Sequence, residues 1–287
     1  MSSSKASGRR APGRGVAASG SMPRSRRQEG GLVLVVDVGN TTSVFGLYRG
    51  DELVLDLRIS SEAQRTSDEY AALLLPLFQH GGVSAASVEA MMVSSVVPPV
   101  DRHLERFARR YLATRPLFVE PGLDAGIEIH YDNPQEVGAD RVVNAVAAKA
   151  KWGAPVVAVD FGTATTFDVV DQSGAYVGGV IAPGLLISAE ALFARASRLY
   201  KVDVRRPQRV LGKNTAEAMQ AGIYYGYIGL VDGILERLLA ELPSPCAVVA
   251  TGGQADLIAS GSRFLSEVDP HLTLTGLRLI CERNRGR

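Results

Sequence analysis

The chain has 287 residues, of which 46% are hydrophobic, and it carries a formal net charge of +1. This length suits one large domain or two of ordinary size, and the apolar content is typical of a globular protein. The two cysteines form no disulfide framework, and no apolar run reaches the roughly 18–20 residues of a membrane span. The N-terminus also lacks the apolar region of a secretion signal, so we expect a cytoplasmic protein.

Residues 1–30 are rich in Ser, Gly, Ala and Arg and show no hydrophobic periodicity. They hold seven basic residues and one acidic residue in a chain whose net charge is +1, which leaves −5 for the remainder. We therefore expect a disordered basic tail on a mildly acidic body, and that body gives no electrostatic reason to expect nucleic-acid binding. The tail composition also fits a transit peptide, although a solvated tail, or an upstream start codon with Met22 as the second candidate, is the simpler interpretation.

The first half of the ordered chain, from about Leu32, predicts three strands followed by alternating helices and strands. Apolar and β-branched runs bounded by turn residues predict the strands, and amphipathic stretches predict the helices. We expect Ser67 to cap the first helix, and Pro98-Pro99 to end the strand before them. The expected strands are 32–37, 43–49, 52–59, 91–97 and 117–120, and the expected helices are 67–79 and 100–111.

The second half repeats this arrangement with longer helices. A helix at about 138–152 precedes three strands, and the final helix is expected to pack back on the body of the protein. The expected strands are 155–160, 164–170, 175–181 and 247–250, and the expected helices are 138–152, 184–199, 215–242 and 272–284.

Each half contains an Asp-x-Gly motif between two predicted strands. Aligning Asp37 with Asp160 also pairs Gly39 with Gly162, Thr42 with Thr165 and Ser43 with Thr166. Glycine lets backbone N–H groups approach an anion, hydroxyl groups can donate to it, and the carboxylate can hold the neutralising cation. The repeat therefore predicts an internal duplication with two phosphate-binding hairpins that face a shared cleft.

This pattern resembles the actin-like, sugar-kinase and heat-shock ATPase superfamily. The resemblance implies an α/β fold with two RNase H-like lobes, each a mixed sheet with flanking helices. We expect the first lobe at residues 31–136 and the second at 137–287.

Residues 131–141 carry a second group of candidate site residues. Asn133-Pro134 predicts a turn and Gly138 opens a helix, so Asp140 and Arg141 lie in the first helical turn. A carboxylate there can take a proton from a substrate hydroxyl, and an arginine can bind a substrate carboxylate with its planar fork. An ordinary helix start is the alternative, because an acidic residue favours the helix dipole. The two expected hairpins nearby favour the functional interpretation.

Together these motifs resemble the type III pantothenate kinase family. The most specific stretch is Gly138 to Ala145, which reads GADRVVNA and is preceded by Tyr131-x-Asn133-Pro134-x-x-Val137. Agreement extends, in order, over residues 37–41, 94–99, 160–168, 178–184, 212–226 and 251–253. The resemblance implies an ATP:pantothenate 4′-phosphotransferase (EC 2.7.1.33), which transfers the γ-phosphate of ATP to the 4′-hydroxyl of pantothenate in the first step of coenzyme A biosynthesis.

The resemblance also implies roles for individual residues. Asp140 matches the catalytic base, Asp160 the ligand of an activating potassium or ammonium ion, and Asp37 is a candidate ligand for Mg²⁺. The family works as a homodimer, in which Thr215 matches a pantothenate contact near the dimer interface. The matching ATP contacts are Asp37, Val38, Gly39, Asn40, Thr41, Thr42, Ser43, Val44 and Thr163. The matching pantothenate contacts are Tyr131, Gly138, Ala139, Asp140, Arg141 and Thr215.

Two other functions fit parts of the sequence. Phosphate hairpins alone also fit a sugar kinase, but Arg141 suits a carboxylated substrate better than a neutral sugar. A non-catalytic regulator that binds nucleotide is supported only by the basic tail. The joint presence of Asp37, Asp140 and Asp160 argues against a decayed site.

Overall fold

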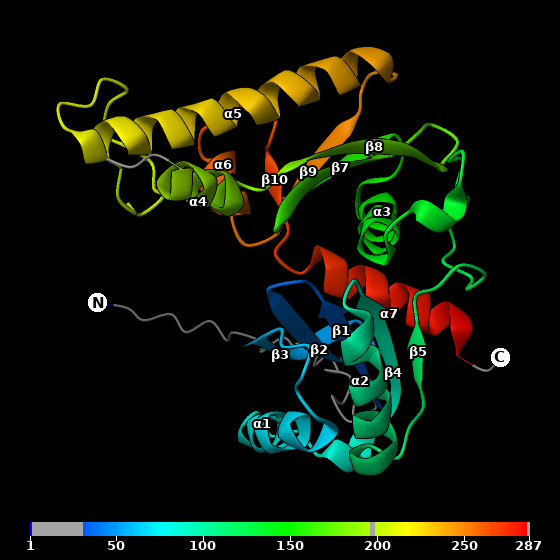
Figure 1. Cartoon of the computed structure of the whole chain (residues 1–287). Helices are drawn as coiled ribbons and strands as arrows, with labels where there is room; N and C mark the ends of the chain where they lie inside the picture. The colour runs from blue at the N-terminus through cyan, green and yellow to red at the C-terminus, as the bar shows by residue number, and fades with distance from the viewer. Residues whose placement is uncertain (2–30, 196–198, 286–287) are drawn as a thin grey trace. The chain divides into compact units, whose positions relative to one another are not determined.

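Two five-stranded sheets with the same strand order form the centre of the fold (Figure 1). The first sheet has the order β3-β2-β1-β4-β5, and the second has β8-β7-β6-β9-β10. In each sheet three consecutive strands pair antiparallel, and two later strands add in parallel. The computed structural model therefore confirms the expected repeat and the α/β fold with mixed sheets. It describes Met1, residues 31–195 and residues 199–285, so the tail expected at 1–30 lies outside the described residues apart from Met1.

Most elements lie close to the ranges that the sequence predicts, but the helix at residues 255–259 and the short strand at 267–268 were not predicted. The strands are β1 (Leu32–Val38), β2 (Thr42–Arg49), β3 (Glu52–Ser60), β4 (Val88–Ser95), β5 (Pro116–Phe118), β6 (Val156–Phe161), β7 (Ala164–Val170), β8 (Tyr176–Pro183), β9 (Ala247–Thr251) and β10 (Glu267–Val268). The helices are α1 (Ser67–His80), α2 (Pro98–Tyr111), α3 (Ala139–Trp152), α4 (Leu185–Arg195), α5 (Thr215–Glu241), α6 (Ala255–Ala259) and α7 (Leu272–Asn284). Short 3-10 helices cover Ala85–Ser87 and Pro134–Glu136.

Alternating side chains of β1 divide the core around the first sheet. Leu32, Leu34 and Val36 pack with α1 and α2, whereas Val33 and Val35 pack with α3 and α7. A strand that is buried on both faces needs this continuous apolar sequence. The final helix thus packs back on the first sheet, as the sequence predicts.

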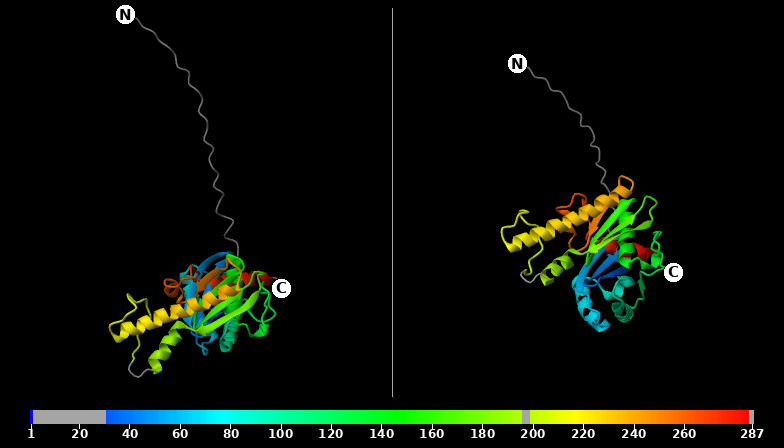
Figure 2. Two further views of the ribbon diagram at one scale, coloured as in Figure 1. Left: turned by 90° about the horizontal axis from the view of Figure 1, so that it is seen from above. Right: turned by 45° about the horizontal axis from the view of Figure 1, so that its top comes forward.

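The second sheet is covered in the same way. Val157 and Val159 of β6 pack with α5 and α6, and Val156 and Ala158 pack with α3. Helices α3 and α7 therefore lie between the two sheets, as Figure 1 shows, while α5 runs along the outer face of the second sheet (Figure 2). Residues 31–287 form one compact unit, and the lobe boundary at residue 136 stays a prediction.

Two local predictions are wrong. Thr66 rather than Ser67 caps α1, because the Thr66 side chain accepts from the Glu69 N–H while the Glu69 carboxylate accepts from the Thr66 N–H. Pro98 and Pro99 open α2, where proline is tolerated because the first helical N–H groups need no partner within the helix.

The alignment of the two hairpins is also offset by one residue. Val38 pairs with Ser43 in the first hairpin, and Phe161 pairs with Thr165 in the second. Ser43 therefore corresponds to Thr165, not to Thr166. The first turn has three residues between its strands and the second has two.

Candidate active site

The turns of the two hairpins lie next to each other. Thr41 Oγ1 of the β1–β2 turn and Thr163 Oγ1 of the β6–β7 turn are 3.3 Å apart, although 122 residues separate them in the chain. Each turn is closed by its glycine: the Gly39 N–H donates to the Thr42 carbonyl at 3.1 Å, and the Gly162 N–H donates to the Ala164 carbonyl at 3.0 Å. The fold thus brings together the two motifs that the sequence predicts to share a phosphate.

The other residues of the first motif divide into exposed and buried positions. Asn40 and Thr41 are exposed at the turn, and Val38 is buried at the end of β1. The Ser43 hydroxyl is fully buried and lies 2.7 Å from the Ser61 hydroxyl. Thr42 and Val44 are half-buried on β2, and Val44 pairs with Asp37. Exposed hydroxyl and N–H groups are thus concentrated at the tip of the turn.

Three carboxylates from different elements converge beside these turns. Asp37 lies near the end of β1, Asp160 near the end of β6 and Asp140 in the first turn of α3. Burial, together with the smaller effects of the charges of Asp140 and Asp160, raises the pKa of Asp37 to about 7. Burial likewise raises the pKa of Asp160 to about 7, with Asp140 adding to it. The effects of Asp140 and Asp160 on the pKa of Asp37, and of Asp140 on that of Asp160, indicate that the three carboxylates are near one another.

Asp140 is held by the start of α3. The Arg141 N–H donates to Asp140 Oδ1 at 2.9 Å, and Gly138 serves as N-cap. A Cβ at Gly138 would lie 2.6 Å from the same oxygen, so the glycine leaves room for this carboxylate. Burial raises the pKa of Asp140, which makes it a better proton acceptor than an exposed aspartate.

Arg141 is buried and only partly paired. Its Nε donates to Asp168 Oδ1 at 2.7 Å, and its guanidinium lies 5.8 Å from the ring centre of Tyr176. Asp168 also accepts from the Tyr176 hydroxyl at 3.1 Å and from the Thr166 hydroxyl at 2.9 Å. Arg141 Nη2 is buried and finds no hydrogen-bond partner among residues 31–195 and 199–285. A buried donor of this kind is costly unless a ligand satisfies it, which makes Nη2 a candidate contact for an anionic substrate group.

Asp160 accepts a hydrogen bond from a neutral amide and lies close to a glycine turn. Asn144 Nδ2 donates to Asp160 Oδ2 at 3.0 Å, and Asn144 Oδ1 accepts from the Thr273 hydroxyl of α7 at 2.8 Å. Gly252 follows β9, and a Cβ there would lie 2.5 Å from Asp160 Oδ1. Only a glycine therefore allows the Gly252-Gly253 turn to pass so close to this carboxylate.

Ser94 is a further polar residue beside Asp37. It pairs with Asp37 across β1 and β4 and is 1% exposed, and its hydroxyl makes no close, well-aligned hydrogen bond among the described residues. The same hydroxyl nevertheless lowers the pKa of Asp37, against the stronger effect of burial. We therefore place Ser94 in the site as a weak partner of Asp37.

The predicted site residues Tyr131 and Thr215 lie in different places. Tyr131 is near the Arg141 cluster, because its ring centre lies 6.3 Å from that of Tyr176. Thr215 is the first residue of α5 and lines an apolar pocket with Leu192 and Met219, and none of the three aspartates contributes to that pocket. Within one copy of the chain, Thr215 is not brought to Asp140.

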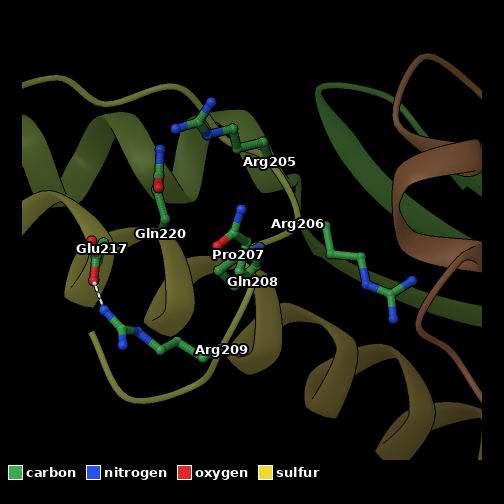
Figure 3. A pocket seen from close by; sticks show the side chains of 7 residues that line it. All are labelled: Arg205, Arg206, Pro207, Gln208, Arg209, Glu217 and Gln220. Carbon is green, nitrogen blue, oxygen red and sulfur yellow. Dashed lines mark hydrogen bonds and ion pairs between the residues drawn. The ribbon is translucent and has the colours of Figure 1, made fainter. Parts of the chain in front are cut away.

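A polar pocket lies at the same end of α5 (Figure 3). The basic residues Arg205, Arg206 and Arg209 line it, and Arg209 pairs with Glu217 of α5 at 3.2 Å. Arg206 donates to the Ser260 carbonyl at 3.0 Å. These arginines lie outside the group of aspartates as well.

The three aspartates are suited to bind a cation whose remaining coordination positions are filled by a bound ligand. Among residues 31–195 and 199–285, no three His, Cys, Asp or Glu side chains are arranged to hold a metal ion by themselves. Asp37 and Asp160 have no basic side chain among their hydrogen-bond or ion-pair partners in these ranges, and their pKa values are raised mainly by burial, with repulsion from neighbouring carboxylates adding to it. Mg²⁺ typically binds one or two carboxylates and takes its other ligands from phosphate and water.

Sequence reasoning missed Asp168, Tyr176, Asn144, Ser94 and Thr273. Asp168 belongs to the matching stretch 160–168, but it lies within a predicted strand. Side chains of a strand alternate between its two faces, so the position alone did not mark Asp168 as a site residue. A buried acidic residue on a strand implies a basic partner, and that signal could have paired Asp168 with Arg141. Thr273 gives no local signal, because the packing of α7 alone brings it to Asn144.

Comparison with known proteins is consistent with this geometry. A family model for type III pantothenate kinase matches residues 33–237. The type III pantothenate kinase of Koribacter versatilis is 51% identical over 264 residues, covering 88% of this chain and 96% of that protein. The type III pantothenate kinase of Geobacter sulfurreducens is 53% identical over 254 residues, covering 88% and 100%.

The fold also occurs in more distant proteins. Component A of (R)-2-hydroxyglutaryl-CoA dehydratase from Acidaminococcus fermentans superposes with a TM-score of 0.50 at 14% identity, covering 87% of this chain and 95% of that chain. At this identity the likeness concerns the fold alone. None of the helices described here combines the length and apolar character needed to cross a bilayer.

Proposed function

The chain belongs to the type III pantothenate kinase family, and we propose how its residues divide the work of that reaction. It is an ATP-dependent kinase that phosphorylates pantothenate in coenzyme A biosynthesis. Phosphoryl transfer asks a protein mainly for positioning and charge neutralisation. The observation that carries the proposal is the meeting of two hairpin turns and three carboxylates at one place.

The two hairpins hold the phosphates of ATP. Residues 37–44 supply N–H and hydroxyl groups from the first turn, and Thr163 supplies them from the second. Thr41 and Thr163 lie 3.3 Å apart, so one phosphate chain can contact both turns. A divalent ion that neutralises the phosphates would be held by Asp37, and a monovalent ion by Asp160, with potassium or ammonium as the candidates.

Asp140 acts as the general base for the 4′-hydroxyl of pantothenate. It lies close enough to Asp37 and Asp160 to share their charge repulsion, and its raised pKa suits a proton acceptor. Arg141 binds the pantothenate carboxylate through Nη2, the donor that lacks a partner. Gly138, Ala139 and Tyr131 border the same part of the site.

A second copy of the chain supplies Thr215. Thr215 lies away from Asp140 within one copy, and it lines an apolar pocket with Ile223 and the exposed side chain of Leu192. A homodimer formed through this face would cover the apolar side chains. We also propose a cytoplasmic location, which the two unpaired cysteines support.

A coupled assay of ADP release tests the proposed division of roles. ADP formation should require pantothenate and should rise when potassium is added to a potassium-free buffer. Pantothenate-dependent turnover that is indifferent to potassium and ammonium would remove the monovalent ion from Asp160. Nucleotide binding without turnover would instead support a regulator.

A further inference from the structure

The outer helix α5 holds the second hairpin through one hydroxyl group. Tyr227 Oη lies 2.5 Å from Thr165 Oγ1 and donates to the Pro183 carbonyl at 3.0 Å. A phenol has a single proton, and here it goes to the carbonyl. Thr165 must therefore donate to Tyr227, which fixes the direction of both hydrogen bonds.

The same connection continues to the tip of the hairpin. Pro183 precedes Gly184, whose N–H donates to the Thr163 carbonyl at 3.1 Å. A Cβ at Gly184 would lie 2.1 Å from that carbonyl oxygen and 2.6 Å from the Gly162 carbonyl oxygen, so the chain segments touch closely here. Tyr227 thus forms hydrogen bonds with Thr165 of β7 and with Pro183 at the end of β8. Gly184, the next residue, forms a hydrogen bond with the turn at Thr163.

The first hairpin has a corresponding support. Ser43 takes the structural position of Thr165, and its buried hydroxyl lies 2.7 Å from that of Ser61. The Ser61 N–H also donates to the Thr41 carbonyl at 2.9 Å. Each turn is therefore supported by a buried hydroxyl on its second strand, and in the part of the chain that the structure describes this hydroxyl bonds to a distant helix at the second turn but to a nearby serine at the first.

We infer that Tyr227 is a positioning residue for the ATP phosphates, acting through the Thr165 hydroxyl and the Pro183-Gly184 segment on the turn at Thr163. This inference rests on the proposed role of the second hairpin in binding ATP. Tyr227 lies on the helix that begins at Thr215, so the face proposed to contact a second copy and the phosphate hairpin share one rigid element.

Replacing Tyr227 by Phe removes the hydroxyl and keeps the ring. Loss of a buried hydrogen bond to the hairpin should raise the KM for ATP by about 5- to 10-fold, while the KM for pantothenate and kcat at saturating ATP change by less than about twofold. Tyr224→Phe is the matched control, because Tyr224 is buried on the same helix and its hydroxyl lies 3.2 Å from that of Ser260, away from the hairpin. It should leave the KM for ATP unchanged.

Two variants of Thr165 separate positioning from packing. Thr165→Val should reproduce the effect of Tyr227→Phe, and the double variant should be no worse than either single one because both remove the same link. Thr165→Ser keeps the hydroxyl and should retain the wild-type KM for ATP. Equal KM values for ATP in Tyr227→Phe and Tyr224→Phe, with similar losses of melting temperature, would overturn the inference.

Thr163→Ala separates this inference from the proposed function. If Thr163→Ala raises the KM for ATP and Tyr227→Phe does not, the hairpin binds ATP and only the inference about Tyr227 fails. If neither variant changes the KM for ATP, the proposed role of the hairpin fails, and the inference fails with it.

Discussion

Thr41 and Thr163 join the two halves of the molecule at the tips of equivalent hairpins, with their hydroxyl oxygens 3.3 Å apart. The two hairpins come from sheets with the same strand order, and helices α3 and α7 lie between those sheets. Helix α3 also presents Asp140 to the same place. In the proposed division of roles, the two equivalent turns bind the phosphates, and the helix between the two sheets supplies Asp140 as the base.

Replacing Asp140 by Asn should abolish most of the turnover. The amide cannot accept the hydroxyl proton, so kcat should fall by roughly 10²–10⁴-fold while ATP still binds. Because burial raises the pKa of Asp140, wild-type kcat/KM should fall as the pH drops through this raised value, and the variant should lose that dependence. Steady-state kinetics as a function of pH test the loss of kcat and the loss of pH dependence. Calorimetry of ATP binding is the control, because binding should be retained. Near-normal turnover would remove Asp140 from the role of base.

The carboxylates should make the cation-free protein less stable at high pH. The pKa of Asp37 and of Asp160 is raised to about 7, above the value of about 3.9 expected in the unfolded chain. Between these values the folded state binds more protons, so the free energy of unfolding falls as the pH rises from about 4 to 7. Melting temperatures in buffer free of Mg²⁺ and K⁺ should therefore be lower at pH 8 than at pH 5.5.

Asp160→Asn provides the control for this pH effect. Removing one of the repelling charges should raise the melting temperature at pH 8 and flatten its pH dependence, although activity is lost. A variant with an unchanged or steeper dependence would show that other groups cause the effect.

Replacing Arg141 by Lys should weaken recognition of the substrate carboxylate. Lysine lacks the planar fork that lets Arg141 contact Asp168 through Nε while Nη2 stays available. We expect the KM for pantothenate to rise by about 10-fold or more, with little change in the KM for ATP. An analogue with an alcohol in place of the carboxylate tests the cause: wild type should strongly prefer pantothenate, and the variant should not. An undiminished preference would assign carboxylate binding to another residue.

Removing the Thr273 hydroxyl should loosen Asp160 through Asn144. Thr273→Val takes away the donor to Asn144 Oδ1, so the amide that donates to Asp160 loses its orientation. The potassium concentration for half-maximal activity should rise by about 3- to 10-fold. Thr273→Ser should behave as wild type, and Thr275→Val is the control on the same helix, because the Thr275 hydroxyl interacts with Tyr48 and not with Asn144. Equal potassium dependence in both valine variants would contradict a link from α7 to the cation site.

A charge on the apolar face near Thr215 should separate the proposed dimer. Leu192 is 40% exposed on α4 and lines the pocket that includes Thr215. Leu192→Glu should yield monomers in light scattering, with a raised KM for pantothenate and retained ATP binding, because a charge is costly in an apolar interface. Leu73→Glu, at a similarly exposed leucine of α1, should stay dimeric. A wild-type protein that is monomeric at assay concentrations would contradict the proposal.

The strands and long helices could be predicted because their apolar patterns are strong. The runs 32–38 and 156–161 are buried on both sides, so they read as continuous β-branched strands. Element ends were less predictable, since the capping of α1 by Thr66 depends on a reciprocal contact with Glu69. The one-residue offset of Ser43 and Thr165 arises because the two turns differ in length, and no local pattern reports that difference.

The sequence predicted a site residue only where a chemically suitable side chain lies at the end of a predicted element. Asp37, Asp140 and Asp160 each stand at the end of an element, where side chains can converge. The partners of the site come from remote segments: Asp168 is 27 residues from Arg141, and Thr273 is 129 residues from Asn144. Tertiary packing alone brings these pairs together, so the sequence pattern could not reveal them.

The most direct measurement is a crystal structure with Mg²⁺, a non-hydrolysable ATP analogue and pantothenate. We expect the γ-phosphate to contact both the turn at Thr41 and the turn at Thr163, with the pantothenate 4′-hydroxyl about 3 Å from a carboxylate oxygen of Asp140. A phosphate chain bound by only one hairpin, or a substrate hydroxyl out of reach of Asp140, would contradict the shared site.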